Sequence, residues 1–316
     1  MKKLKVLVTG CGGDIGQSIG KILLGNDSVI DLHGFDITYK NAAKFIFPTF
    51  QTIPKVTDKG YIDFISKYVR NHQIDLVIPI AEPELRHYAL KGWNEQNIGT
   101  KVLLTNQKAL SVGFDKMKTA HFLASNGLTY PITIPIASSE NRVQLPVIFK
   151  SRTGSGSKSV IHVKDTATFD FYKKLYQKED FIIQEFIPAD EGEYTCGLFR
   201  SYSGEIRTII FLRELTGGYS GYGEIVESKN INKLLKNLAE ALDLRGSINV
   251  QMRLRDGVPL IFEINPRFSS TVYFRHLFGF EDVVWSIADL FEEPIPPYKP
   301  KTKTSRFYKG FNEYID

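Results

Sequence analysis

Cysteines and long apolar runs are both scarce in this sequence of 316 residues. Cys11 and Cys196 are its only cysteines, so we expect no disulfide framework and a reducing, cytoplasmic compartment. No segment approaches the roughly 20 apolar residues that a membrane-spanning helix needs. The start of the chain, residues 1–8, has too short an apolar run for a signal peptide and is typical of a first strand. We therefore expect no membrane partner.

A large excess of one charge is also absent. The 40 lysines and arginines and the 35 acids leave a formal net charge of +5, and the basic residues are spread along the chain. This distribution argues against nucleic acid as a partner and is compatible with a local site for a small anion. No histidine lies at zinc-site spacing, and no serine nucleophile motif is present. The length suits two or three domains, and the oligomeric state stays open, with a homodimer among the options.

The N-terminal segment has the pattern of a Rossmann unit. A buried-strand pattern at 4–8 is followed by a glycine-rich turn at 10–16, a helix to about Leu24 and a second strand that ends in Asp36. Alternating helix and strand patterns continue to Leu104 and predict an α/β domain of about one hundred residues. The turn could bind a dinucleotide, face another substrate, or be a tight turn without a ligand.

The most informative segment is 247–270, where apolar and polar residues alternate on both sides of Asp256-Gly257. Period-two alternation around Asp-Gly predicts a β-hairpin with one apolar face. A two-residue turn would place Gln251 opposite Phe262. We expect instead a three-residue loop at 256–258, with Gly257 at positive φ, because it gathers four polar residues on one face: Asn249, Gln251, Glu263 and Asn265.

These polar residues suit a metal that is shared with phosphate. They offer amide oxygens and one carboxylate, and Arg267 follows directly. Mg²⁺ usually takes one or two carboxylates and fills its other positions with phosphate oxygens and water. We expect Gln251, Glu263 and Asn265 to hold Mg²⁺, with Mn²⁺ able to replace it. On the alternation alone, a hairpin with one solvated face is the simpler interpretation.

Two motifs in this hairpin, Asn249-Val250-Gln251 and Glu263-Ile264-Asn265-Pro266-Arg267, resemble the metal-binding strand pair of the ATP-grasp family. The resemblance is strongest to the synthetase units of the carbamoyl phosphate synthase large chain. It implies an α/β and α+β architecture, with a Rossmann-like N-terminal (pre-ATP-grasp) domain followed by a two-lobed ATP-grasp fold. The expected parts are the N-terminal domain, the small lobe, the large lobe with the metal site and a C-terminal tail, at residues 1–105, 106–180, 181–295 and 296–316.

The middle of the chain resembles the ATP-binding parts of that family. The strand at 145–150 ends in Lys150, and a glycine- and serine-rich loop follows whose backbone N–H groups could fold over phosphates. Segment 181–187 resembles the strand whose backbone reads adenine, and Glu193 matches the ribose-binding acid, with Asp190 and Glu191 as rivals. The resemblance implies that twelve residues bind the nucleotide: Lys116, Lys150, Gly154, Ser155, Gly156, Ser157, Gln184, Glu185, Phe186, Ile187, Glu193 and Asn249.

The resemblance also implies a reaction. A substrate carboxylate would attack the γ-phosphorus of ATP, and an amine would then attack the acyl phosphate. Arg267 would be the catalytic residue, and Arg213, Glu82 and Glu84 would contact the small-molecule substrates. The chain has the length of one synthetase unit where the carbamoyl phosphate synthase large chain has two, which favours a stand-alone carboxylate–amine ligase. Two alternatives stay open: an ATP-binding module without turnover, and an NAD(P)-dependent oxidoreductase that uses the glycine turn.

Overall fold

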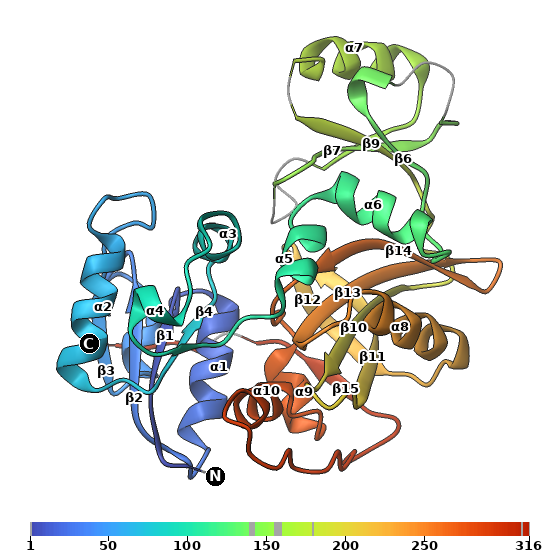
Figure 1. Cartoon of the computed structure of the whole chain (residues 1–316). Helices are drawn as coiled ribbons and strands as arrows, with labels where there is room; N and C mark the ends of the chain where they lie inside the picture. The colour runs from blue at the N-terminus through green and yellow to red at the C-terminus, as the bar shows by residue number, and fades with distance from the viewer. Residues whose placement is uncertain (1, 139–142, 155–159, 179, 311, 316) are drawn as a thin grey trace.

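The computed structural model describes residues 2–138, 143–154, 160–178, 180–310 and 312–315, which form three β-sheets and their helices. Figure 1 shows the N-terminal sheet on the left, the small sheet at the top and the large sheet below it. We call the small sheet with its helix the small lobe, and the large sheet with its helices the large lobe. The expected α/β and α+β architecture is confirmed. Among the described residues, no helix has both the length and the apolar character needed to cross a membrane.

The N-terminal sheet is parallel, with strand order β3-β2-β1-β4-β5. Its central strand β1 (Leu4–Thr9) is almost completely buried, as its apolar run between two helical layers requires. Gly10 has a φ of +67°, and a side chain at Gly16 would meet the backbone of Cys11, so the turn needs both glycines. The other elements are β2 (Val29–Asp36), β3 (Thr49–Thr52), β4 (Leu76–Pro79), β5 (Lys101–Val102), α1 (Asp14–Leu24), η1 (Ala42–Phe45), α2 (Tyr61–His72), α3 (Glu82–Lys91) and α4 (Glu95–Ile98).

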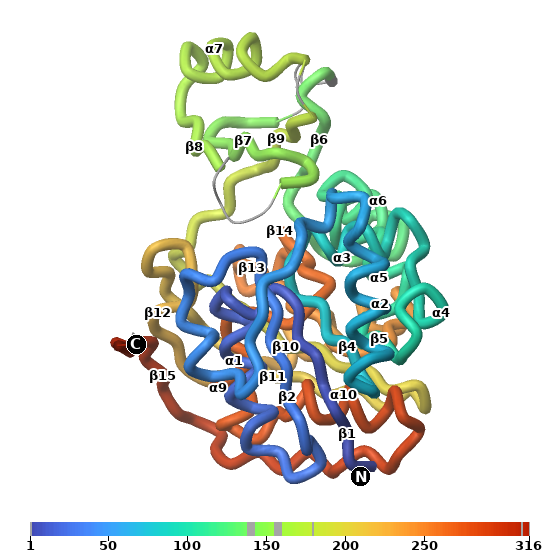
Figure 2. Tube along the Cα trace, turned by 90° about the vertical axis from the view of Figure 1, so that its left-hand side faces the viewer, coloured from blue at the N-terminus to red at the C-terminus, as the bar shows by residue number. Residues whose placement is uncertain are grey.

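The small lobe is an antiparallel sheet of order β6-β9-β7-β8 with one covering helix. The ring of Phe149 contacts those of Phe169 and Tyr172 from the helix, which attaches the helix to the sheet. Figure 2, turned by 90°, shows this lobe standing above the rest of the molecule. Its elements are β6 (Thr133–Pro135), η2 (Ile136–Ser138), β7 (Val147–Ser151), β8 (Ile161–Val163), α7 (Thr166–Tyr176) and β9 (Phe181–Glu185).

The large lobe is a sheet of order β14-β13-β10-β11-β12-β15 that is buried on both faces. Along β10, Leu198 packs into the cluster beneath α8, and Phe199 packs into the cluster around Trp285. Strands β10 and β11 form a hairpin that turns around Ser203-Gly204. The elements are β10 (Glu193–Arg200), β11 (Ile206–Thr216), β12 (Tyr219–Ile225), α8 (Lys229–Ala241), β13 (Gly246–Arg255), β14 (Val258–Asn265), α9 (Val272–Leu277), α10 (Asp282–Leu290) and β15 (Arg306–Tyr308).

Two segments lie differently from the part boundaries that the sequence suggests. Helices α5 (Gln107–Gly113) and α6 (Lys116–Ser125) share a hydrophobic cluster with the large lobe, although they fall within the small-lobe range 106–180. In the expected tail, β15 pairs with β12 as an edge strand of the large sheet. Beyond it, Lys309 forms an ion pair with Asp14, which ties this end of the chain to α1.

The central hairpin β13–β14 has the predicted register at its polar end. Gln251 pairs with Glu263, and Asn249 pairs with Asn265. Opposite residues of an antiparallel pair point to the same face, so these four side chains lie on one side of the sheet.

The predicted three-residue loop at the tip of this hairpin is wrong. Asp256 and Gly257 both have positive φ, at 52° and 72°, and form a two-residue turn closed by the pair Arg255 and Val258. Such a turn alone would place Gln251 opposite Phe262. Instead, a β-bulge leaves Phe262 out of the pairing and shifts the register by one residue.

Candidate active site

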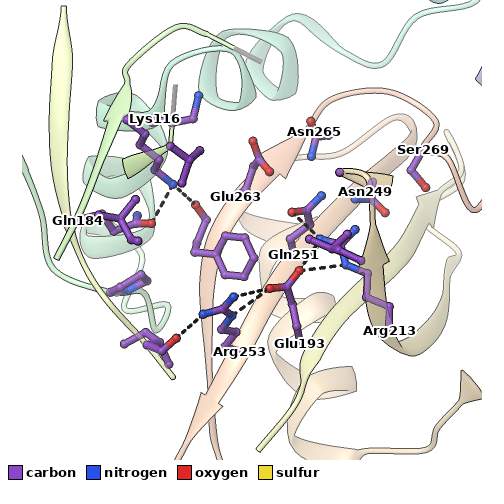
Figure 3. Close-up of a pocket in the computed structure, with 18 of the residues that line it drawn as sticks. Lys116, Gln184, Glu193, Arg213, Asn249, Gln251, Arg253, Glu263, Asn265 and Ser269 are labelled. Atoms are coloured by element: carbon purple, nitrogen blue, oxygen red, sulfur yellow. Dashed lines mark hydrogen bonds and ion pairs between the residues drawn. The ribbon is translucent and has the colours of Figure 1, made fainter. Parts of the chain in front are cut away.

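A cavity of about 360 Å³ lies between the small lobe and the large lobe. In Figure 3, side chains from both lobes point toward one another across it. Segments far apart in the sequence therefore meet at one site. The expected site residues that line the cavity are Lys116, Lys150, Gly154, Gln184, Glu185, Phe186, Ile187, Glu193, Arg213, Asn249, Gln251, Glu263, Asn265 and Arg267.

Lys150 is the most deeply placed cation of the site. It lies on β7 and is buried, and its Nζ donates to Gln184 Oε1 at 2.8 Å and to the carbonyl of Phe262 at 3.4 Å. The pKa of Lys150 is lowered to about 8, chiefly by burial; the charge of Glu263 opposes this shift, and neighbouring Lys116 adds to it. An ammonium with only neutral hydrogen-bond partners in a buried site is poised to receive an anion.

Lys116 is the first residue of α6, and its Nζ donates to the carbonyl of Gly154 at 2.5 Å. Asp115 caps this helix and also binds Arg152 through two hydrogen bonds of 2.7 and 2.8 Å. These contacts attach the start of the glycine-rich loop to α6. Three of the expected nucleotide-binding residues lie outside the described part of this loop: Ser155, Gly156 and Ser157.

Glu263 faces the cavity without a hydrogen bond or ion pair to any residue that the structure describes. Burial lowers the pKa of three cations, Lys116, Lys150 and Arg267, and the charge of Glu263 opposes that shift in each of them. The side chain of Asn265 also has no hydrogen bond within the described chain. A partnerless carboxylate beside a partnerless amide fits a hard cation that completes its shell with phosphate and water.

Gln251 fits the metal less well than its neighbours do. Its Oε1 accepts a hydrogen bond from Arg213 Nη2 at 3.1 Å, so a guanidinium already occupies one side of the oxygen that a cation would need. No group of three or more His, Cys, Asp or Glu residues with metal-binding geometry occurs in the described chain. Of the three residues expected to hold the metal, Glu263 and Asn265 are the two whose side chains no described residue engages.

Glu193 is held between two arginines, as Figure 3 shows. One carboxylate oxygen accepts from Arg213 and the other from Arg253, with nearest distances of 2.7 Å in both pairs. Burial would raise the pKa of Glu193, but the two guanidinium groups outweigh it and hold the pKa below its usual value. Of the rival acids, Glu191 accepts from the backbone N–H groups of the β13–β14 turn, and Asp190 is exposed.

The expected adenine strand forms an aromatic wall of the cavity. Phe186 stacks on His162 with ring centroids 4.0 Å apart. The Arg253 guanidinium lies 5.7 Å from the Phe186 ring and donates to the carbonyl of Ile187 at 2.5 Å. Sequence reasoning missed Arg253, and its alternation with Gln251 along β13 was the available signal.

The carboxylate of Glu185 is used within the protein. It accepts from the N–H of Ile132 at 3.0 Å and forms an ion pair with Arg255. Gln184, next to it, bridges Lys150 and Thr133. The side chains of Gln184 and Glu185 therefore hold neighbouring residues of the protein in position.

Arg267 lines the cavity and donates to the carbonyl of Phe268 at 2.9 Å. Burial lowers the pKa of Arg267, and the charges of Glu82 and Glu263 oppose that shift. Glu82 itself forms an ion pair of 2.6 Å with Arg86 and does not line the cavity.

Glu84, the other acid expected to face a substrate, lies inside the N-terminal domain. It is 4% exposed and accepts hydrogen bonds from the hydroxyls of Thr9 and Tyr61. Burial raises the pKa of Glu84 to about 7, although both hydrogen bonds favour the charged form. The structure therefore removes Glu84 from the cavity lining and gives it a place in the core.

The glycine-rich turn at 10–16 is packed against other residues of the N-terminal domain. The N–H of Gly12 donates to Asp36 Oδ2 at 2.8 Å, and a side chain at Gly12 would collide with Asp36 and Asn41. Asp36, the acid at the end of β2, thus pairs with the glycine-rich turn. Sequence reasoning assigned no site role to several other residues that line the cavity, among them Ile15, Tyr219, Ser269 and Ser270. The two serines directly follow the Arg267 motif.

Comparisons with known proteins place both halves of the chain. Residues 114–271 match the ATP-grasp domain model, and residues 7–103 match the PylC-like N-terminal domain model. A curated relative is the carbamoyl phosphate synthase large chain of Sulfolobus acidocaldarius, 24% identical over 296 residues. That match covers 85% of this chain and 28% of the relative, so the chain spans about a quarter of that protein.

Two solved structures share the fold at low identity. The ADP complex of N5-carboxyaminoimidazole ribonucleotide synthetase has a TM-score of 0.76 and 16% identity, covering 95% of this chain and 80% of that one. The L-amino acid ligase of Bacillus licheniformis has a TM-score of 0.72 and 18% identity, covering 98% of this chain and 80% of that one. Because the ATP-grasp model matches residues 114–271, from the start of α6 through the hairpin β13–β14, the chain belongs to the ATP-grasp family.

Proposed function

We propose that this protein is an ATP-dependent carboxylate–amine ligase that acts through an acyl phosphate. One observation carries the proposal. Glu263, with no protein partner among the described residues, faces a cavity that also holds Lys116, Lys150 and Arg267. An uncompensated carboxylate opposite three cations is the arrangement needed for a triphosphate and its metal.

Mg²⁺ fits this donor set, with Glu263 and Asn265 as the residues that would hold it. When bound, it would supply charge neutralisation to the phosphates. Phosphate oxygens and water would complete the coordination shell of the metal, since the oxygen of Gln251 is engaged by Arg213.

The chain's own cations divide the remaining work. Lys150 lies on β7 of the small lobe and Lys116 begins α6, which packs with the large lobe; both line the cavity and are available to offset phosphate charge. Arg267 lines the same cavity within the field of Glu263 and is available to stabilise the transferring phosphoryl group. A substrate carboxylate oxygen attacks the γ-phosphorus, and ADP leaves. An amine nitrogen then attacks the acyl carbon, phosphate leaves, and the nitrogen loses a proton.

The cavity also suits an anionic small molecule. Ser269, Ser270 and Arg267 line it, whereas the charge of Arg213, which lines it too, is paired with Glu193. The named relatives support this choice, since one is a ligase of amino acids and another is a synthetase seen with ADP. Both are less than 25% identical to this chain, so they support the fold and leave the substrate pair to experiment.

The test measures ADP release with Mg²⁺ over pools of carboxylates and amines. Hydroxylamine added to the carboxylate pools would trap an acyl phosphate as a hydroxamate. Lys116→Met should lower the rate at least tenfold, because it removes a cation from the cavity. Lys118→Met, an exposed lysine on the same helix, is the matched control and should retain the rate. Nucleotide binding without ADP release in any pool would favour the module without turnover.

A further inference from the structure

A buried polar network contacts the hairpin β13–β14, which we call the metal hairpin because it carries Glu263 and Asn265. Arg275, on α9, is fully buried, and its Nη2 donates to Asn249 Oδ1. Its Nη1 donates to Asp282 Oδ2 at 3.3 Å, and Ser247 Oγ donates to the same oxygen at 2.7 Å. Thr195 Oγ1 adds a hydrogen bond of 2.9 Å to Asn249 Oδ1. The network therefore ends on a single amide oxygen at the cavity wall.

The guanidinium determines which way the Asn249 amide points. Arginine has five N–H donors and no acceptor, so the atom of Asn249 that it contacts must be the oxygen. That leaves the amide nitrogen as the free polar atom of the side chain. It makes no hydrogen bond with any residue in the described part of the chain, and Asn249 lines the cavity beside Gln251 and Ser269 (Figure 3).

A glycine makes this contact sterically possible. Gly197 pairs with Asn249 across β10 and β13, and a side chain at Gly197 would lie 2.9 Å from Arg275 Nε. Any larger residue would displace the guanidinium from the sheet. The approach of a fully buried arginine to Asn249 is thus built into two elements of the large lobe.

We propose that Asn249 donates a hydrogen bond from its amide nitrogen to a phosphate oxygen of the nucleotide, and that Arg275 is the positioning residue that holds the amide in this orientation. The inference rests on the proposed function, because it needs an anion in the cavity. It differs from the metal-ligand role, in which Asn249 would present its oxygen. It also separates Asn249 from Asn265, directly opposite in the hairpin, whose amide has no such arginine.

Two substitutions at Asn249 distinguish a donor from a ligand. Asn249→Asp keeps oxygens for Arg275 and Thr195 but replaces the donor with a negative oxygen. Asn249→Ala removes the donor without adding charge. A hydrogen bond to a charged group predicts that ATP affinity falls about tenfold in Asn249→Ala and about a hundredfold in Asn249→Asp, with Mg²⁺ and with EDTA alike. Calorimetric titration of the purified full chain measures both.

Asn237→Asp is the matched control, because it makes the same chemical change at an exposed position of α8 that does not line the cavity. It should retain the ATP affinity of the wild type. The donor role is overturned if Asn249→Asp binds MgATP as tightly as the wild type, or more tightly than Asn249→Ala. Failure of the wild type to bind ATP at all would refute the proposed function instead, so the two failures are distinguishable.

The positioning role of Arg275 is tested by a cycle. Arg275→Met with Asp282→Asn removes both charges of the buried pair together, so neither is left unpaired. It should weaken ATP binding at least threefold in the wild type and less than twofold in the Asn249→Ala background. An equal loss of ATP affinity in both backgrounds would show that Arg275 has only a structural role and would refute its positioning role. Where that variant does not fold, Gly197→Ala, which displaces the same guanidinium, takes its place in the cycle.

Discussion

Replacing Lys150 with methionine should remove two pH dependences that run in opposite directions. Lys150 is buried on β7, and burial lowers its pKa from the usual 10.5 to about 8, with Lys116 adding to the shift and Glu263 opposing it. The protein contains many other titrating groups, so each dependence is read as the difference between the wild type and Lys150→Met at the same pH. Methionine has a similar length and fills the same space without a charge.

The first dependence concerns the stability of the free protein. Between about pH 8 and 10.5, the unfolded chain still binds a proton at Lys150 that the folded chain has lost. The unfolded state therefore binds more protons, and the free energy of unfolding rises with pH in this window. The shift of about 2.5 units corresponds to about 3 kcal/mol over the full window. This increment should be absent from Lys150→Met.

The second dependence concerns ATP affinity. The phosphates need the ammonium form of Lys150, which is about half populated at pH 8 in the free protein. Affinity should therefore fall about tenfold from pH 7 to pH 9, and binding at pH 8 should take up about half a proton. Calorimetry in two buffers of different ionisation enthalpy measures that uptake, and urea unfolding measures the stability. Equal proton uptake by the wild type and Lys150→Met, or a parallel pH response of stability and affinity, would refute this account; the exposed Lys118→Met should behave as the wild type.

Three further substitutions test other parts of the site and fold. Glu263→Gln should make ADP affinity independent of Mg²⁺, because it removes the one carboxylate available to the metal; a retained Mg²⁺ dependence in calorimetry would contradict the assignment. Arg267→Ala should leave ADP binding within about threefold and slow turnover by about a hundredfold or more, the effect of losing a single transition-state contact of ~3 kcal/mol; wild-type turnover would reject it. Glu84 has its pKa raised from 4.5 to about 7, so its stabilising contribution is present below pH 4.5 and is lost as pH rises through 7. In urea unfolding, Glu84→Gln should therefore lose about 3 kcal/mol less stability than the wild type between pH 4.5 and 8, and an unchanged slope would argue against the raised pKa.

The sequence is most informative where burial leaves a local periodic pattern. The run at β1 and the alternation along β13 each predict a strand and its buried face correctly. The alternation along β14 predicts the strand, but its expected apolar face is wrong, because the bulge puts Ile261 on the core face and Phe262 in the cavity lining. The pairing of Glu193 with Arg213 was also within reach. A hairpin whose strands end at Ser201 and Glu205, with its centre at Ser203, sets these two residues opposite each other, and the structure has that register.

Contacts between segments distant in the sequence leave no such signal. Glu193 also pairs with Arg253 because β10 lies beside β13, and no turn connects those two strands directly. Glu84 is a helix N-terminal acid whose burial depends on Tyr61 from another helix and Thr9 from β1. A substrate-facing role for such an acid is therefore reasonable from the sequence, yet tertiary packing gives it a structural one.

The tip of the metal hairpin shows how a wrong local expectation can accompany a correct register. Asp256-Gly257 makes the two-residue turn that this dipeptide strongly favours, because both residues adopt positive φ. The β-bulge at Phe262 then sets Gln251 opposite Glu263, the pairing that we expected from a three-residue loop. The bulged carbonyl is free of the sheet ladder and lies 3.4 Å from Lys150 Nζ. The same irregularity thus aligns Glu263 with Gln251 and contacts the lysine across the cavity, in agreement with the concentration of bulges beside active sites.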